Sequence, residues 1–114
     1  MGRQRISLTP AAQDALTVLG QQIRFARHDR VWSMAELAAR AGVSENTVRA
    51  IETGGANPSI GNVFNVAVAA GVPLFSADRD ELDRLARDGA ARLALLPTRV
   101  DEPRRKDVDG DFDF

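Results

Sequence analysis

The sequence has no cysteine and no tyrosine, and its aromatic residues are limited to five phenylalanines and one tryptophan. Without cysteine, neither a disulfide framework nor a thiolate metal site can form, and this composition fits a reducing compartment. No apolar run is long enough to cross a membrane, and the N-terminal segment lacks the apolar stretch of a signal peptide. We therefore expect a cytoplasmic protein of 114 residues, with one domain and a short appendage.

Groups that carry catalysis are also scarce. The single histidine, His28, falls between charged residues of an expected helix, where a surface position is typical. Gly54 and Gly55 follow the C-terminus of an expected helix, which is the wrong end for binding an anion. We expect no enzymatic activity, no cofactor and no metal site.

The sequence also has no excess of basic residues, and its net charge is −1. The distribution of charge is more informative than its sum. Residues 1–60 carry seven arginines against five acidic residues, whereas the last eight residues, DVDGDFDF, contain four aspartates and no base. The acidic end of the chain therefore masks a mildly basic N-terminal part.

The most informative segment, residues 33–58, predicts two short helices joined by a tight turn. Ser33 can cap the first helix, and Glu36 completes a capping box. Gly42 suits the end of this helix, and Ser44 can cap the next one. Apolar residues recur at helical spacing in both segments, so the pattern indicates a helix-turn-helix, whose second helix enters the major groove of DNA.

Three further helices are expected around this motif. The first begins at Thr9-Pro10 and ends near Asp29, the fourth follows Ser59 and ends at Gly71, and the fifth runs from about Arg79 to Leu95. Their expected apolar faces are Leu16, Leu19, Ile23 and Ala26; Ile60, Val63, Phe64, Ala67 and Val68; and Leu82, Leu85, Ala86, Leu93 and Leu96.

These elements predict an all-α protein with four segments. Residues 1–8 form a flexible basic arm, in which Arg3 and Arg5 either lie along phosphates or are simply solvated. Residues 9–76 form the helix-turn-helix domain, and residues 97–114 form a disordered charged tail. Residues 77–96 form an additional helix that either covers the core or pairs two protomers. We favour pairing, because helix-turn-helix readers usually engage two half-sites.

Residues 19–74, which begin LGQQIRFARHDRVWSMAELAARAGVSENTVRAIETGG, resemble the Cro/phage-repressor (XRE) family. The resemblance implies a five-helix phage-repressor-like domain that binds double-stranded DNA, with a homodimer on a palindromic operator and a role as a repressor. Arg27 and Glu52 align with a salt bridge that this family often makes. Glu45 and Met34 depart from the family pattern, which usually has glutamine at these positions.

The exposed start of the third helix supplies the candidates for DNA recognition. Asn46 suits a bidentate pair with adenine and Arg49 one with guanine, while Glu45 either accepts from cytosine or favours the positive end of the helix. The full set of expected base-reading residues is Glu45, Asn46, Thr47, Arg49 and Ala50. The expected phosphate contacts are Arg24, Met34, Ser44, Asn57 and Asn62.

The tail leaves several interpretations open. It is a solvated tail or degradation handle, or it folds onto a partner through Arg104, Arg105, Asp111, Phe112 and Phe114. A Ca²⁺ site is disfavoured, because the chain ends before an EF-hand loop is complete. A helix-turn-helix domain with such a tail is similar to antitoxins of the HipB type. That similarity implies autorepression of an operon and binding of a HipA-like kinase toxin.

Two other functions remain open at this point. The first is an inhibitor or adaptor that uses the helix-turn-helix fold and the acidic tail to bind another protein without reading DNA, which Glu45, Met34 and the low net charge allow. A regulator controlled by a small ligand is a weaker alternative, because the sequence shows no sensor domain.

Overall fold

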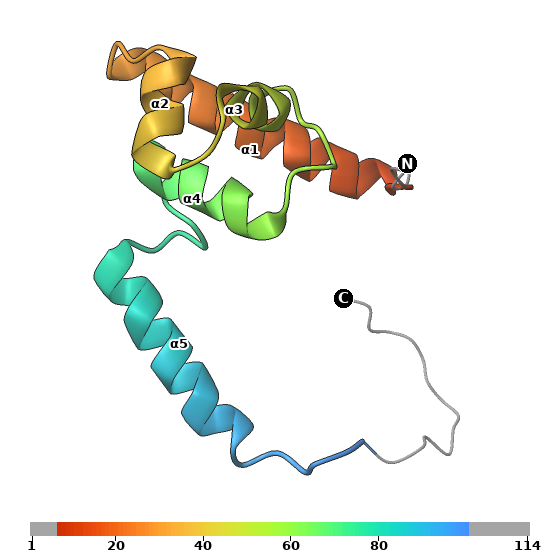
Figure 1. Ribbon diagram of the computed structural model, residues 1–114. Helices are drawn as coiled ribbons and strands as arrows, with labels where there is room; N and C mark the ends of the chain where they lie inside the picture. Colours follow the sequence, from red (N-terminus) through yellow and green to blue (C-terminus); the bar gives the residue numbers. More distant parts are fainter. Residues whose placement is uncertain (1–6, 101–114) are drawn as a thin grey trace. The chain divides into compact units, whose positions relative to one another are not determined.

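The computed structural model describes residues 7–100, and this part of the chain is built from α-helices (Figure 1). The expected all-α class with five helices is confirmed. None of the helices in the described part is long and apolar enough to cross a membrane. The helices are α1 (Pro10–Asp29), α2 (Met34–Ala41), α3 (Glu45–Glu52), α4 (Ile60–Ala70) and α5 (Arg79–Leu93).

Short-range hydrogen bonds set the beginnings of the helices. The Ser33 hydroxyl accepts from the Glu36 amide at 3.1 Å, and the Glu36 carboxylate accepts from the Ser33 amide at 2.8 Å, so the expected capping box is present. Ser44 and Ser59 each cap their helix by accepting from the amide three residues later. Gly42 ends α2 with φ of 73°, in the left-handed region that glycine adopts easily.

The hydrophobic core lies among the first four helices. Each of α1, α2 and α3 packs against α4, and α3 also packs against α1 and α2. One large side chain from each helix is fully buried there: Ile23, Leu37, Val48 and Val66. The helix-turn-helix formed by α2 and α3 is therefore held on a platform made by α1 and α4.

The expected inward face of α4 is partly wrong. Ile60 is 72% exposed and Val68 is half-exposed, whereas Val66 and Ala70 are completely buried. The buried face follows positions 63, 66, 67 and 70, which is also a helical pattern. α4 is apolar on most of its sides, so the sequence pattern allowed more than one face to be chosen. Packing against α2 and α1 selects the face centred on Val66.

Gly20 brings α1 and α3 into close contact. A Cβ atom at this position would lie 2.5 Å from the carbonyl oxygen of Ile51 and 2.8 Å from that of Glu52. Real Cβ atoms do not approach backbone oxygens so closely, so only glycine fits without a shift of one helix. The last turn of α3 is thereby seated directly on the middle of α1.

The chain divides into two compact units, of which the first ends at Arg79 and the second begins at Asp80. In the second unit, α5 has no buried residue. The tail residues expected to bind a partner, Arg104, Arg105, Asp111, Phe112 and Phe114, lie outside the described residues, as do Arg3 and Arg5.

Candidate nucleic-acid interface

Helix α3 presents one polar face and buries the other. Glu45, Asn46 and Arg49 are exposed, whereas Val48 and Ile51 are buried in the core. The two remaining expected base-reading residues, Thr47 and Ala50, are half-buried. The polar face therefore offers three long side chains, from the first and second turns of the helix, to a ligand.

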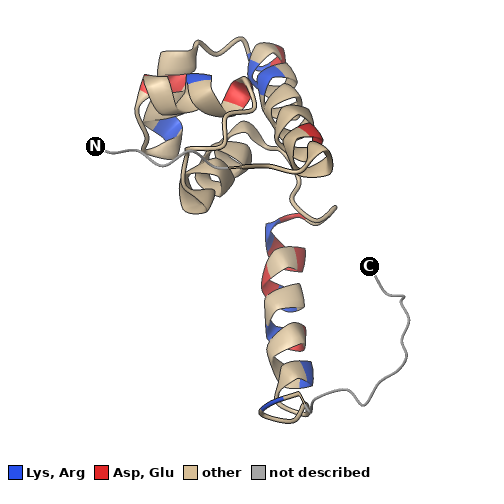
Figure 2. Ribbon diagram, turned by 90° about the vertical axis from the view of Figure 1, so that its right-hand side faces the viewer, with Lys and Arg blue, Asp and Glu red and all other residues tan. Residues whose placement is uncertain are grey.

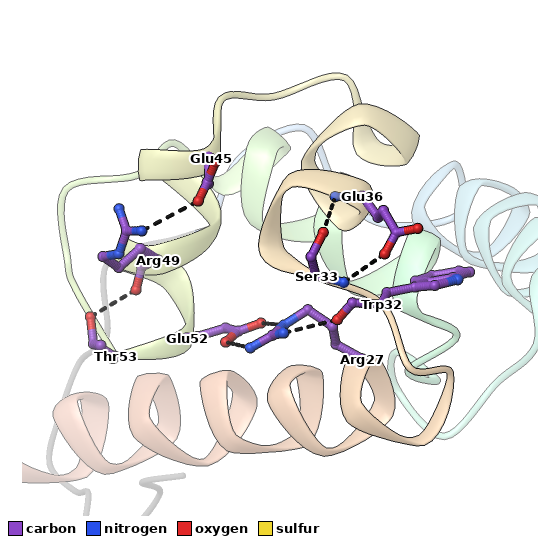
Figure 3. A network of polar contacts seen from close by, with 8 residues as sticks. All are labelled: Arg27, Trp32, Ser33, Glu36, Glu45, Arg49, Glu52 and Thr53. Carbon is purple, nitrogen blue, oxygen red and sulfur yellow. Dashed lines mark hydrogen bonds and ion pairs between the residues drawn. The ribbon is translucent and has the colours of Figure 1, made fainter.

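These three side chains form a connected row on the surface. Nη1 of Arg49 donates to Oδ1 of Asn46 at 2.8 Å. Nη2 of Arg49 donates to the Glu45 carboxylate at 3.4 Å (Figure 3). The Glu45–Arg49 pair is half-exposed, so it stabilises by only about 0.3–0.5 kcal/mol. A bidentate contact between an arginine and guanine is worth about 1–3 kcal/mol. The contact between Glu45 and Arg49 is therefore the weaker of these two kinds of interaction.

A buried ion pair connects the end of α3 to α1. Arg27 and Glu52 are only 7% and 6% exposed, and Nε and Nη2 of Arg27 donate to the two carboxylate oxygens of Glu52 at 2.6 and 2.9 Å. Nη1 of Arg27 also donates to the carbonyl oxygen of Trp32 at 3.0 Å (Figure 3). The hydrogen bonds to Glu52 raise the pKa of Arg27 above its usual value. The side chain of Arg27 therefore connects α1 to α3 and to the segment that leads into α2.

Further contacts hold the C-terminal end of α3, and the sequence did not reveal them. The Thr53 hydroxyl donates to the carbonyl oxygens of Arg49 and Ala50, at 3.0 and 3.1 Å. Nε2 of Gln13 donates to the carbonyl oxygen of Gly54 at 3.2 Å, so α1 also supports the loop after α3. A surface glutamine or threonine gives no sequence signal for such a contact. Gln13 supports the loop after α3 only because the fold brings Gly54 beside it.

The expected phosphate contacts occupy different environments. Arg24 and Asn57 are exposed and Asn62 is half-buried. The Ser44 hydroxyl caps α3 and lies 2.9 Å from the Thr47 hydroxyl, so both hydroxyls already share a hydrogen bond. Met34 is half-buried and packs against the core. Its side chain therefore contributes packing at the start of α2, while the backbone amides there remain the groups suited to an anion.

Metal chemistry has no visible basis in residues 7–100, where no group of three or more histidine, cysteine or acidic side chains could hold an ion. His28 is exposed on the last turns of α1.

Residues 23–75 match the helix-turn-helix family, and they form a helix-turn-helix domain of the Cro/C1 (XRE) type. Proteins of this family are DNA-binding regulators, and the match suggests a DNA-binding role for the domain formed by residues 23–75. The matched segment extends from Ile23 in α1 through the loop after α4. Neither a curated protein nor a solved structure gives a significant match to the chain.

Proposed function

We propose that this protein is a sequence-specific transcriptional repressor that binds a palindromic operator as a homodimer. The observation that carries the proposal is the polar face of α3, where Arg49 is exposed and held beside Asn46 by a 2.8 Å hydrogen bond. α3 in turn is anchored by the buried Arg27–Glu52 pair. A rigid helix with a few placed polar side chains is the arrangement that reads base edges in the major groove.

The substitution Arg49→Lys tests base reading. Lysine keeps the positive charge but cannot make the planar bidentate contact of arginine. Fluorescence anisotropy would measure binding to the DNA upstream of the protein's own gene and to a scrambled duplex, each at two salt concentrations. We expect about a tenfold or greater loss of affinity for the upstream DNA and little change for the scrambled duplex.

The matched control is Arg84→Lys, which makes the same exchange at an exposed position of α5, outside the helix-turn-helix. It should bind both duplexes as the unaltered protein does. For the unaltered protein, specific binding should weaken as salt rises, because phosphate contacts release counterions. Equal binding of the upstream and scrambled DNA by the unaltered protein would contradict the proposed repressor.

We further propose that the repressor is the antitoxin of a HipBA-like operon. Support comes from the sequence of the tail, in which Arg104 and Arg105 precede aspartates that alternate with Phe112 and Phe114. Such a segment can fold onto a partner, with the aromatic rings as anchors. The test is co-purification with the product of a neighbouring kinase-like gene. Phe112→Ala/Phe114→Ala should abolish co-purification and leave DNA binding unchanged, and unchanged co-purification would remove the tail from this role.

A second candidate function is inhibition of another protein by the helix-turn-helix unit itself. A surface hollow of about 640 Å³ is lined by residues of α1 and of the loop after α4, including Phe25, Val72 and Pro73. Phe25 is one of the residues that line this hollow, and it is 71% exposed. An exposed aromatic ring beside a hollow is typical of a protein contact. This function predicts that Phe25→Ser abolishes partner binding, whereas Arg49→Lys affects no DNA complex.

A further inference from the structure

Two roles are open to Asn46 on the polar face of α3. In the first, Asn46 reads adenine directly: its amide oxygen accepts from the amino group of the base, and its amide nitrogen donates to a ring nitrogen. In the second, Asn46 holds Arg49, because its Oδ1 atom accepts from Nη1 of Arg49 at 2.8 Å. This hydrogen bond is shorter than the 3.4 Å contact of Arg49 with the Glu45 carboxylate, so Asn46 is the closer partner of the arginine.

Arg49 determines the orientation of the Asn46 amide. A guanidinium donates through all its N–H groups and accepts nothing, so the atom of Asn46 that faces Arg49 must be the oxygen. A charged donor makes a stronger hydrogen bond than the neutral amino group of adenine does, so Arg49 is the better partner for this oxygen. The amide nitrogen, Nδ2, has no hydrogen bond to any of residues 7–100. Asn46 therefore offers a base mainly a donor, whereas adenine requires a donor and an acceptor together.

Arg49 keeps donors for a base while it is held. Asn46 and Glu45 each engage one of its terminal nitrogens, and Figure 3 shows the contact with Glu45. Each terminal nitrogen carries a second N–H group, and Nε makes no hydrogen bond within the described residues. The remaining donors suit guanine, because this base presents only acceptors in the major groove.

An arginine side chain binds a base more tightly when it is already held. The side chain of Arg49 is half-exposed, and its hydrogen bonds within the described residues are those with Asn46 and Glu45. A free arginine side chain adopts many rotamers, and contact with a base must immobilise it. A hydrogen bond that forms before the base arrives removes part of this entropic loss. A residue that makes such a bond strengthens the base contact without touching the base.

Charge alone gives this domain little selectivity among DNA sequences. Basic and acidic positions are interspersed along α1, α2 and α3 (Figure 2), and attraction to phosphates is independent of sequence in any case. Selectivity must therefore come from side chains placed on base edges. Arg49 is the single basic residue of α3, so the geometry in which it is held affects selectivity directly.

We propose that Asn46 is a positioning residue, which holds the guanidinium of Arg49 ready for a guanine and does not itself read adenine. The inference rests on the proposed repressor, and it names the base that the recognition helix selects. Removal of Asn46 should weaken the same base contact as removal of Arg49, by a smaller factor, because Arg49 still reaches the guanine but is held less well.

A double-mutant cycle on altered operators tests this role. The upstream duplex is prepared with each base pair exchanged in turn, A·T for G·C and the reverse. Fluorescence anisotropy then gives the affinity of each duplex for the unaltered protein, Asn46→Ala, Arg49→Ala and the double variant. Arg49→Ala should lose discrimination at a G·C pair. Asn46→Ala should lose about three- to tenfold of the discrimination at that same pair, and it should add nothing once Arg49 is gone.

The matched control is Asn65→Ala, which makes the same exchange at an exposed position of α4 and should bind every duplex as the unaltered protein does. Circular dichroism checks that all variants keep their helix content. Loss of discrimination at an A·T pair in Asn46→Ala, or losses that add in the double variant, would overturn the proposal, because either result means that Asn46 reads a base by itself. An equal loss on every duplex would overturn it too, because Asn46 would then support only the helix.

A measurement without DNA separates this inference from the proposed repressor. NMR relaxation of the side-chain Nε–H groups gives an order parameter for each arginine. Arg49 should be more ordered than Arg24, which is exposed on α1 and has no hydrogen bond or ion pair within the described residues. Asn46→Ala should lower the order parameter of Arg49 toward that of Arg24, and Asn65→Ala should leave it unchanged.

An Arg49 as mobile as Arg24 in the unaltered protein would overturn the positioning role even if the upstream DNA is bound specifically. A protein that orders Arg49 through Asn46 but binds upstream and scrambled DNA equally would overturn the repressor and the choice of guanine, while the contact between the two side chains stands. The two failures are therefore distinguishable.

Discussion

The buried pair between Arg27 and Glu52 leads to the prediction that the structure specifies most fully. Glu52→Gln removes the negative charge but keeps the shape of the side chain. It leaves the guanidinium of Arg27, 7% exposed, with its hydrogen bond to the carbonyl oxygen of Trp32 and a neutral amide in place of a carboxylate. Breaking a buried pair from one side typically costs about 3–5 kcal/mol, because the remaining charge is buried without compensation.

We expect Glu52→Gln to lower the free energy of unfolding by about 3 kcal/mol, at the lower end of that range because the amide oxygen still accepts one hydrogen bond. Arg27→Met should cost as much or more, because its removal deprives both carboxylate oxygens of Glu52 of their arginine donors. The double variant Arg27→Met/Glu52→Leu replaces the pair with apolar side chains of similar volume, and it should lose clearly less than either single variant.

Urea unfolding, followed by far-ultraviolet circular dichroism as a signal of helix content, measures the free energy of unfolding of all four proteins. A small domain has a total stability of only about 5–10 kcal/mol, so the single variants should be studied at low temperature. The reasoning is refuted if the losses in the two single variants simply add in the double variant, because additivity would mean that the two side chains do not interact.

The pH dependence of the pair has a definite sign. The pKa of Arg27 is raised in the folded protein, so its contribution is fully present below the pKa of the unfolded arginine and is lost only as the pH rises through the higher folded value. Titration of Arg27 should therefore leave stability unchanged across the neutral range.

Two further predictions concern the seat of α3 and its polar face. Gly20→Ala should lower the free energy of unfolding by about 1–3 kcal/mol, because the added methyl group pushes α3 away from α1. Urea unfolding measures the loss, and an unchanged stability would show that α3 can move away from α1 without cost. Glu45→Gln should raise the affinity for upstream and scrambled DNA alike by about threefold, since it removes a negative charge near phosphates and releases Arg49. Fluorescence anisotropy measures both affinities, and a loss of affinity for the upstream DNA alone would instead assign base recognition to Glu45.

The candidate site was predictable to different degrees. The exposed positions of α3 followed from its helical period once Ser44 was placed as the cap. The pairing of Arg27 with Glu52 came from the family resemblance, because no local pattern connects residues so far apart. The hydrogen bond from Gln13 to the loop after α3 had no sequence signal at all. The contacts that orient α3 are thus harder to foresee than the residues it displays.

The sequence alone determined where the helices begin and end. Ser33, Ser44 and Ser59 each bond to an amide three residues away, and Gly42 and Gly71 take up positive φ at helix ends. These interactions are complete within one turn, so they depend on neighbouring residues only.

The tertiary structure decided which faces are buried and how closely helices approach. The sequence of α4 favoured Ile60 and Val68 as inward residues, but packing buried Val66 and Ala70 instead. The sequence gives no sign that Gly20 differs from other positions of a long helix, but in the fold it lies against the carbonyl oxygens of α3. Burial depends on partners distant in the chain, and an apolar helix leaves several faces nearly equal in energy until those partners are in place.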